Sequence, residues 1–181
     1  MRIDYKIDEN DFLTYQLYVA SKSEKIKKNR KRTKLIIPVL YIALALWFMV
    51  QDSHSLAFIF FIIALFWFFL YPLWERRRYM NHYKRCIKEH YKDRIGKTAS
   101  IEFDNELIIA KDSQIESKIV TRELEEIAEI STTIFIKLKG GQSLILPKEK
   151  INDIDSLTAR LKELATYLHI EYNIDDKWAW K

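Results

Sequence analysis

The chain has 181 residues, of which 49% are hydrophobic and 30% charged, and its net charge is +5. That length suffices for one compact domain plus a small membrane element. The three glycines (Gly96, Gly140 and Gly141) cannot form a phosphate-binding loop or a dinucleotide-binding fingerprint, and the single cysteine, Cys86, excludes an intramolecular disulfide.

The first 34 residues predict a strand followed by a helix. Apolar and charged side chains alternate over residues 2–7, which predicts a short strand that pairs with the C-terminal half. Asp8, followed three residues later by Asp11, is typical of a helix N-terminus. We expect a helix over about 10–33, amphipathic in its first half and basic in its second.

Residues 35–74 predict a membrane hairpin. Two uncharged apolar runs, 35–50 and 56–74, flank a polar turn at 51–55. A single helix over the whole segment would be roughly 60 Å long, about twice the hydrocarbon thickness of a bilayer, so the segment must fold back on itself. The first run, at roughly 24 Å, is shorter than that thickness. Neither run contains an ionisable side chain, which argues against a pump or secondary transporter.

The residues that flank the hairpin are strongly basic. Residues 22–34 carry a net charge of +7 and residues 75–94 a net charge of +5, so the rest of the chain must sum to −7. The positive-inside rule then predicts a two-span membrane protein with both termini in the cytoplasm. No nucleic-acid partner is expected, because such a binder would carry its excess charge on the folded domain.

Nine of these flanking cations are candidate contacts for anionic lipid. Juxtamembrane cations contribute roughly 1 kcal/mol each near an anionic surface. The candidates are Lys27, Lys28, Arg30, Lys31, Arg32, Lys34, Arg76, Arg77 and Arg78. Membrane topology alone also explains these charges, so specific lipid binding stays an alternative.

Residues 75–96 predict a basic juxtamembrane helix that ends at Gly96. His82, Cys86 and His90 recur on it at every fourth position. Because His82 and His90 would stand roughly 12 Å apart along the axis, the three cannot share one metal ion. We expect neither a metal nor another cofactor.

Residues 97–170 predict a cytosolic antiparallel β domain. Short strands are expected at 99–103, 107–110, 115–121, 126–131, 134–138 and 143–146, with a tight turn at Asp104-Asn105, a two-residue turn at Gly140-Gly141 and a strand end at Pro147. Asn152 or Asp153 should cap a final helix that closes the domain. Its apolar stripe comprises Ile154, Leu157, Leu161, Leu164 and Leu168.

The tail, residues 171–181, contains Trp178 and Trp180 but too sparse a pattern to predict an element. If exposed, these tryptophans would enter the membrane interface or dock a partner; otherwise they would pack back on the sheet. The sequence does not choose among these three. The predicted fold class is therefore an α+β membrane protein, a two-helix transmembrane hairpin plus a β domain closed by a helix.

In their order along the chain, several motifs resemble the YcxB-like family of small bacterial membrane proteins. They are Asp11-Phe12-Leu13-Thr14-Tyr15-Gln16-Leu17-Tyr18, Ser21-Lys22-Ser23 with its basic run, the two-span hairpin, and Ile145-Leu146-Pro147-Lys148. Where that family has Trp-x-x-Ile, this chain has Leu124-Glu125-Glu126-Ile127. The resemblance implies a location in the bacterial cytoplasmic membrane, a pleckstrin-homology-like C-terminal domain and no established activity.

No catalytic constellation is visible in the sequence, since the four histidines are scattered over three segments. We therefore expect a membrane-anchored, non-enzymatic interaction or regulatory module of the inner membrane, with a protein partner or a homo-oligomer. The alternatives are an anionic-lipid-binding membrane protein and an accessory subunit of a membrane enzyme or transporter.

Overall fold

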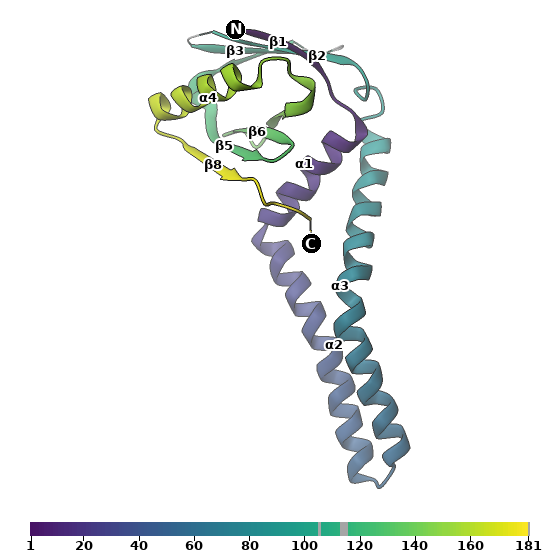
Figure 1. The fold of residues 1–181 in the computed structure, drawn as a ribbon. Coiled ribbons are helices and arrows are strands. Elements are labelled where there is room, and N and C mark those ends of the chain that lie inside the picture. The colour runs from purple at the N-terminus through teal and green to yellow at the C-terminus, as the bar shows by residue number, and fades with distance from the viewer. Residues whose placement is uncertain (105, 113–115, 181) are drawn as a thin grey trace. The chain divides into compact units, whose positions relative to one another are not determined.

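The computed structural model describes residues 1–104, 106–112 and 116–180, and the fold is α+β (Figure 1). The chain forms two compact units. One, the β unit, comprises residues 1–15 and 84–179, and the other, the hairpin unit, comprises residues 16–83 and 180–181. The division falls inside helix α1 and inside helix α3.

The first sheet of the β unit is antiparallel throughout, in the order β1-β2-β3-β4. Its strands are β1 (Arg2–Lys6), β2 (Thr98–Phe103), β3 (Leu107–Lys111) and β4 (Glu116–Val120). Ile3 pairs with Ile101 and Tyr5 with Ala99, which confirms that the N-terminal strand pairs with the C-terminal half. The predicted turn residue Asn105 and the predicted strand residue Ile115 lie outside the described residues.

The second sheet has the order β7-β6-β5-β8 and is mixed. Its strands are β5 (Leu124–Ile130), β6 (Thr133–Leu138), β7 (Ser143–Pro147) and β8 (Glu171–Asp175). The strands within the predicted domain, residues 97–170, pair antiparallel as predicted. Strand β8 runs parallel to β5 and lies in the tail, where no element was predicted. The predicted two-residue turn at Gly140-Gly141 is wrong, because the Leu138 N–H donates to the Gln142 carbonyl and four residues connect β6 to β7.

The two sheets share one apolar core, which helix α4 (Ile154–Leu168) closes as predicted (Figure 1). Asp153 caps α4 by accepting a hydrogen bond from the Ser156 N–H at 3.2 Å. The predicted stripe enters the core, and Leu157 and Leu161 are fully buried. Two short 3-10 turns, η1 (Thr121–Glu123) and η2 (Lys148–Lys150), complete the unit.

Three helices run through the hairpin unit: α1 (Glu9–Lys22), α2 (Glu24–Val50) and α3 (His54–His90). The single helix predicted over 10–33 is wrong, because Ser23 adopts extended backbone angles and caps α2 with its Oγ. The basic run and the first span therefore form one helix, α2.

Helix α3 likewise joins the second span to the basic juxtamembrane segment, since it continues through Pro72. It ends at His90 and not near Gly96, which adopts a positive φ of 75° and donates its N–H to the Ile7 carbonyl at 2.8 Å. Only 51–53 separate α2 from α3, because Asp52 takes a left-handed φ of 57° that reverses the chain at once. Both α2 and α3 are long and apolar enough to cross a membrane.

Candidate functional site at the charged base of the hairpin

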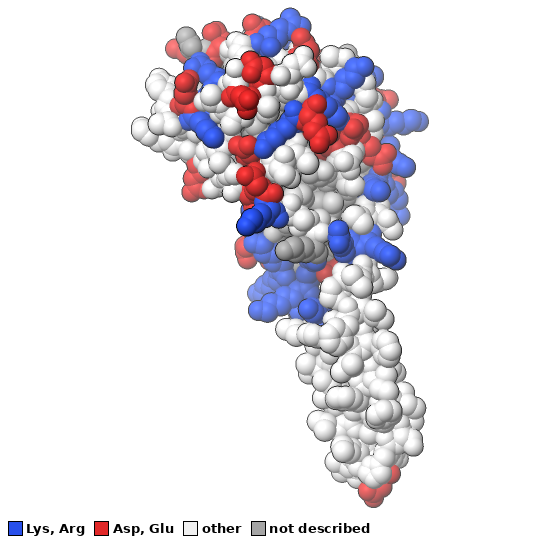
Figure 2. Space-filling model, viewed as in Figure 1, with Lys and Arg blue, Asp and Glu red and all other residues white. Residues whose placement is uncertain are grey.

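Helices α2 and α3 bring the nine predicted lipid-contact residues to the same end of the hairpin. We call this set the basic collar: Lys27, Lys28, Arg30, Lys31, Arg32 and Lys34 on α2, with Arg76, Arg77 and Arg78 on α3. The two groups meet because Arg30 lies opposite Glu75 across the hairpin. Figure 2 shows an uncharged surface between the blue end of the hairpin and the red at its turn.

The charge of the hairpin unit is concentrated in this collar. Residues 16–83 include eleven Lys or Arg against three Asp or Glu, a net charge of +8, whereas the β unit has eighteen against twenty-two, a net charge of −4. The collar is therefore the positive region that could meet a layer of anionic headgroups.

The collar side chains point in several directions around the helices. Arg76, Arg77 and Arg78 are all exposed, and consecutive helical residues point about 100° apart. On α2, most collar side chains are exposed as well, while Arg30 and Lys34 are half-buried. A ring of this kind suits many phosphate groups in a plane better than it suits one bound ligand.

Arg30 is engaged by other residues of the hairpin unit. Its Nε donates to the Glu75 Oε2 at 2.9 Å, and the Tyr71 hydroxyl donates to the Glu75 Oε1 at 3.0 Å. Glu75 is only 5% exposed, so both oxygens of a buried carboxylate are satisfied. Glu75 was not predicted as a site residue. In a helical hairpin that turns at Asp52, however, residues at equal distances from the turn face each other, and Arg30 and Glu75 lie 22 and 23 residues from it.

Trp180 covers the Arg30 guanidinium. Its ring lies 4.7 Å from the Arg30 Cζ and 5.6 Å from the Tyr79 ring, and the residue is 6% exposed. Trp180 is therefore buried against side chains of α2 and α3, a placement that none of the three alternatives named. Its indole N–H is buried without a hydrogen-bond partner. Trp178 is half-buried.

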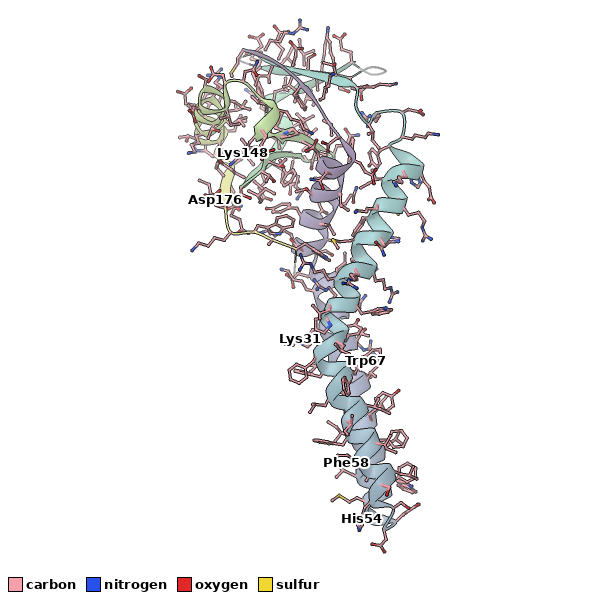
Figure 3. The ribbon with its side chains drawn as sticks, turned by 45° about the vertical axis from the view of Figure 1, so that its right-hand side comes forward. Lys31, His54, Phe58, Trp67, Lys148 and Asp176 are labelled. Carbon is pink, nitrogen blue, oxygen red and sulfur yellow. The ribbon has the colours of Figure 1, made fainter. Side chains whose placement is uncertain are left out.

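Aromatic side chains mark the level at which the charge-free spans begin. The Lys34 Nζ lies 4.6 Å from the Phe68 ring, and Arg78 lies over Trp74 at 5.4 Å. Arg30 on α2 lies opposite Glu75 on α3. Residues 71–74, which precede Glu75 on α3, therefore lie beside the basic segment 31–34 of α2 and not beside its apolar span. The charge-free segments that lie side by side are therefore residues 35–50 of α2 and 56–70 of α3. They contain 16 and 15 residues, which correspond to about 23 to 24 Å of helix. Figure 3 shows Lys31 and Trp67 nearer the base and Phe58 and His54 nearer the turn.

In the part of the chain that the structure describes, no three His, Cys, Asp or Glu side chains are placed to hold a metal ion. The His90 imidazole Nδ1 lies 2.9 Å from the Cys86 carbonyl oxygen.

No protein-family model matches this chain, and searches of the curated proteins and of the solved structures give no match. The resemblance to the YcxB-like family remains a prediction that rests on the motifs quoted above.

Proposed function

We propose that the chain is a membrane-anchored, non-enzymatic interaction module of the bacterial cytoplasmic membrane. The observation that carries this proposal is the abrupt change from the basic collar to two spans in which Asp52, at the turn, is the single charged residue. Lys and Arg beside a span remain on the cytoplasmic side, so both ends of the hairpin lie in the cytoplasm. The β unit then binds a protein partner, or a second copy, close to the inner leaflet.

We also propose that the β unit is pleckstrin-homology-like, as the YcxB-like resemblance implies. Two sheets around one core and the helix α4 after β7 support this interpretation. Strand β8, parallel to β5, would be an addition to that fold.

Cysteine labelling in intact cells tests the orientation. In a Cys86→Ser background, a membrane-impermeant maleimide should label Ser53→Cys in the turn. The matched variant Asn29→Cys, exposed within the collar segment, should be labelled only after the membrane is permeabilised. Equal labelling of both variants in intact cells, or release of the protein by carbonate, would contradict the proposal.

Crosslinking in intact cells, followed by identification of the proteins captured, tests the module itself. We expect a reproducible partner, or a second copy, crosslinked to the β unit. A hydrolase or transferase activity of the purified chain that one point substitution abolishes would overturn the non-enzymatic assignment.

The collar favours a second function, binding of anionic lipid. Replacing Arg76, Arg77 and Arg78 together with Gln should weaken retention of anionic lipid by about a hundredfold, at about 1 kcal/mol for each charge. Replacing Lys84, Arg85 and Lys88, three cations on the same helix outside the collar, is the matched control. Equal lipid co-purification from the two triple variants would exclude a specific role for the collar.

A further inference from the structure

An apolar groove of about 390 Å³ lies between α2 and α3 near the turn. It exists because the residues buried between the helices at this level, Ala45 and Ala57, are small. Larger side chains line it, among them Ile42, Met49 and Phe58. Met49 is 58% exposed and Phe58 64% exposed, so the groove is open to the side.

The surroundings of a membrane span dictate what can fill such a groove. If the groove were empty, the apolar atoms that line it would lose dispersion contacts. Water is a poor occupant, because it would find too few hydrogen-bond partners there. Within a bilayer the available apolar groups are acyl chains and the side chains of another hairpin.

Polar groups stand at one end of the groove only. His54 is the polar residue of the lining, and Asp52 lies two residues before it. The Asp52 N–H donates to the carbonyl of Met49, a lining residue, at 3.2 Å, so the Asp52 backbone adjoins the turn end of the groove. Asp52 is exposed. An apolar groove that ends at a turn with an exposed acidic residue matches an amphiphile with a cationic head.

The same carboxylate disfavours a second copy as the occupant. Two hairpins inserted in one orientation with their grooves in contact would bring two Asp52 side chains to the same depth. Like charges placed side by side repel each other. A zwitterionic lipid meets the carboxylate with an ammonium group instead.

We propose that this groove holds one acyl chain of a phospholipid with a primary-amine headgroup, whose ammonium faces Asp52. This inference rests on the proposed membrane anchoring. It assigns the turn end of the hairpin a lipid class different from the anionic lipids that the collar would attract.

The test uses the full chain in nanodiscs that contain an ethanolamine phospholipid with a photoactivatable acyl chain. Crosslinks should concentrate on Met49, Phe58 and Phe61, all of which line the groove. Ile42→Trp fills the groove and should lower this labelling by about tenfold, the change expected if about 1.4 kcal/mol of preference is lost. The matched control Leu40→Trp replaces an exposed residue on another side of α2, outside the lining, and should leave the labelling unchanged.

Asp52→Asn tests the headgroup without altering the groove. The preference for an amine headgroup over a glycerol headgroup should fall by up to about fivefold, as for loss of an exposed ion pair, while acyl labelling persists. An unchanged preference overturns the amine assignment. Labelling spread evenly around both helices, or crosslinks between two copies, overturns the groove assignment.

Failure of the anchoring and failure of the groove give different results. A chain that carbonate extracts from membranes, or that shows no one-sided turn labelling, refutes the anchoring. A chain that inserts with the expected orientation and is labelled evenly refutes the groove alone.

Discussion

Glu75 shows how one residue decides the structure at the base of the hairpin. A buried carboxylate is tolerated only when its charge is paired and its oxygens accept hydrogen bonds. Arg30 and Tyr71 supply both, and Trp180 shields the pair from one side. The Arg30 side chain thereby fastens α2 to α3, so one member of the basic collar has a structural task.

Removing one partner of this ion pair should destabilise the hairpin. Glu75→Gln keeps an acceptor for Tyr71 but leaves Arg30 without its counter-charge. Because the Arg30 side chain is 23% exposed, solvent reduces the penalty of a buried pair, and we expect a loss of about 1 to 3 kcal/mol. Thermal unfolding of the full chain in detergent measures it, with Arg77→Gln, an exposed neighbour, as the control. The double variant Arg30→Met with Glu75→Leu should recover most of the loss, and no recovery would contradict the ion-pair account.

Glu129 should make the β unit sensitive to acid. Although burial alone would raise the pKa of its carboxyl, hydrogen bonds from Lys148 and Tyr172 hold that pKa below the usual 4.5. A carboxyl with a lowered pKa in the folded state stabilises the fold above its unfolded-state pKa, and this contribution disappears as the pH falls through the folded-state pKa.

Glu129→Gln should therefore lower the stability of the β unit at neutral pH by about 1 to 3 kcal/mol and flatten its loss in acid. Urea unfolding followed by circular dichroism, from neutral pH to below 4.5, measures both effects. Glu163→Gln is the control, because the Glu163 side chain is 71% exposed. An unchanged acid slope in Glu129→Gln would rule out this carboxyl as the cause.

Residue-scale predictions from the sequence succeeded where the interaction is local. Asp8 accepts from the Asp11 N–H at 3.0 Å and Asp11 accepts from the Asp8 N–H at 2.8 Å, as the spacing of three residues predicts. The Arg30–Glu75 pair spans 45 residues, so it depends on a hairpin register that composition alone does not specify. Trp180 meets Arg30 over a still longer separation, which explains why its burial was not predicted.

At the scale of elements, strong periodicity was a reliable guide and weak periodicity was not. Helix α4 has a complete apolar stripe, and it lies on the core as predicted. Strand β8 alternates over five residues only, with Tyr172 and Ile174 as its apolar positions, which was too short a pattern to predict a strand. In the structure Tyr172 is half-buried and Ile174 is 55% exposed at the edge of a sheet. The break at Ser23 was hidden by the continuous basic run around it.

The stripe of α4 gives a stability prediction for this element. Leu161 is fully buried among residues of the shared core, so Leu161→Ala should cost about 2 to 5 kcal/mol through lost burial and a residual cavity. Tyr167→Ala, on the same helix but 76% exposed, should change the stability by about 0.5 kcal/mol or less. Hydrogen exchange of β5 and β6 amides in the full chain measures both variants. Equal protection in the two would show that α4 does not close the core.

At the scale of the whole molecule, the short charge-free length of the hairpin is the feature with the widest consequence. The shared length of about 23 to 24 Å is about 6 Å less than a typical hydrocarbon core of about 30 Å. Mismatch costs a fraction of a kcal/mol for each ångström, so the hairpin should be stabilised by about 1 to 3 kcal/mol in a bilayer thin enough to match it.

Reconstitution into bilayers of different thickness tests this expectation. The unaltered chain should unfold at a higher temperature in short-chain lipids than in long-chain lipids. Four leucines added after Val50 and four before Leu56 lengthen each span by about 6 Å, and this variant should prefer the thicker bilayer. Eight Gly and Ser residues inserted at Ser53 lengthen the chain equally without extending the apolar spans, and should leave the original preference intact. If the leucine and Gly-Ser variants prefer the same bilayer, the length of the charge-free spans does not set the preferred bilayer thickness.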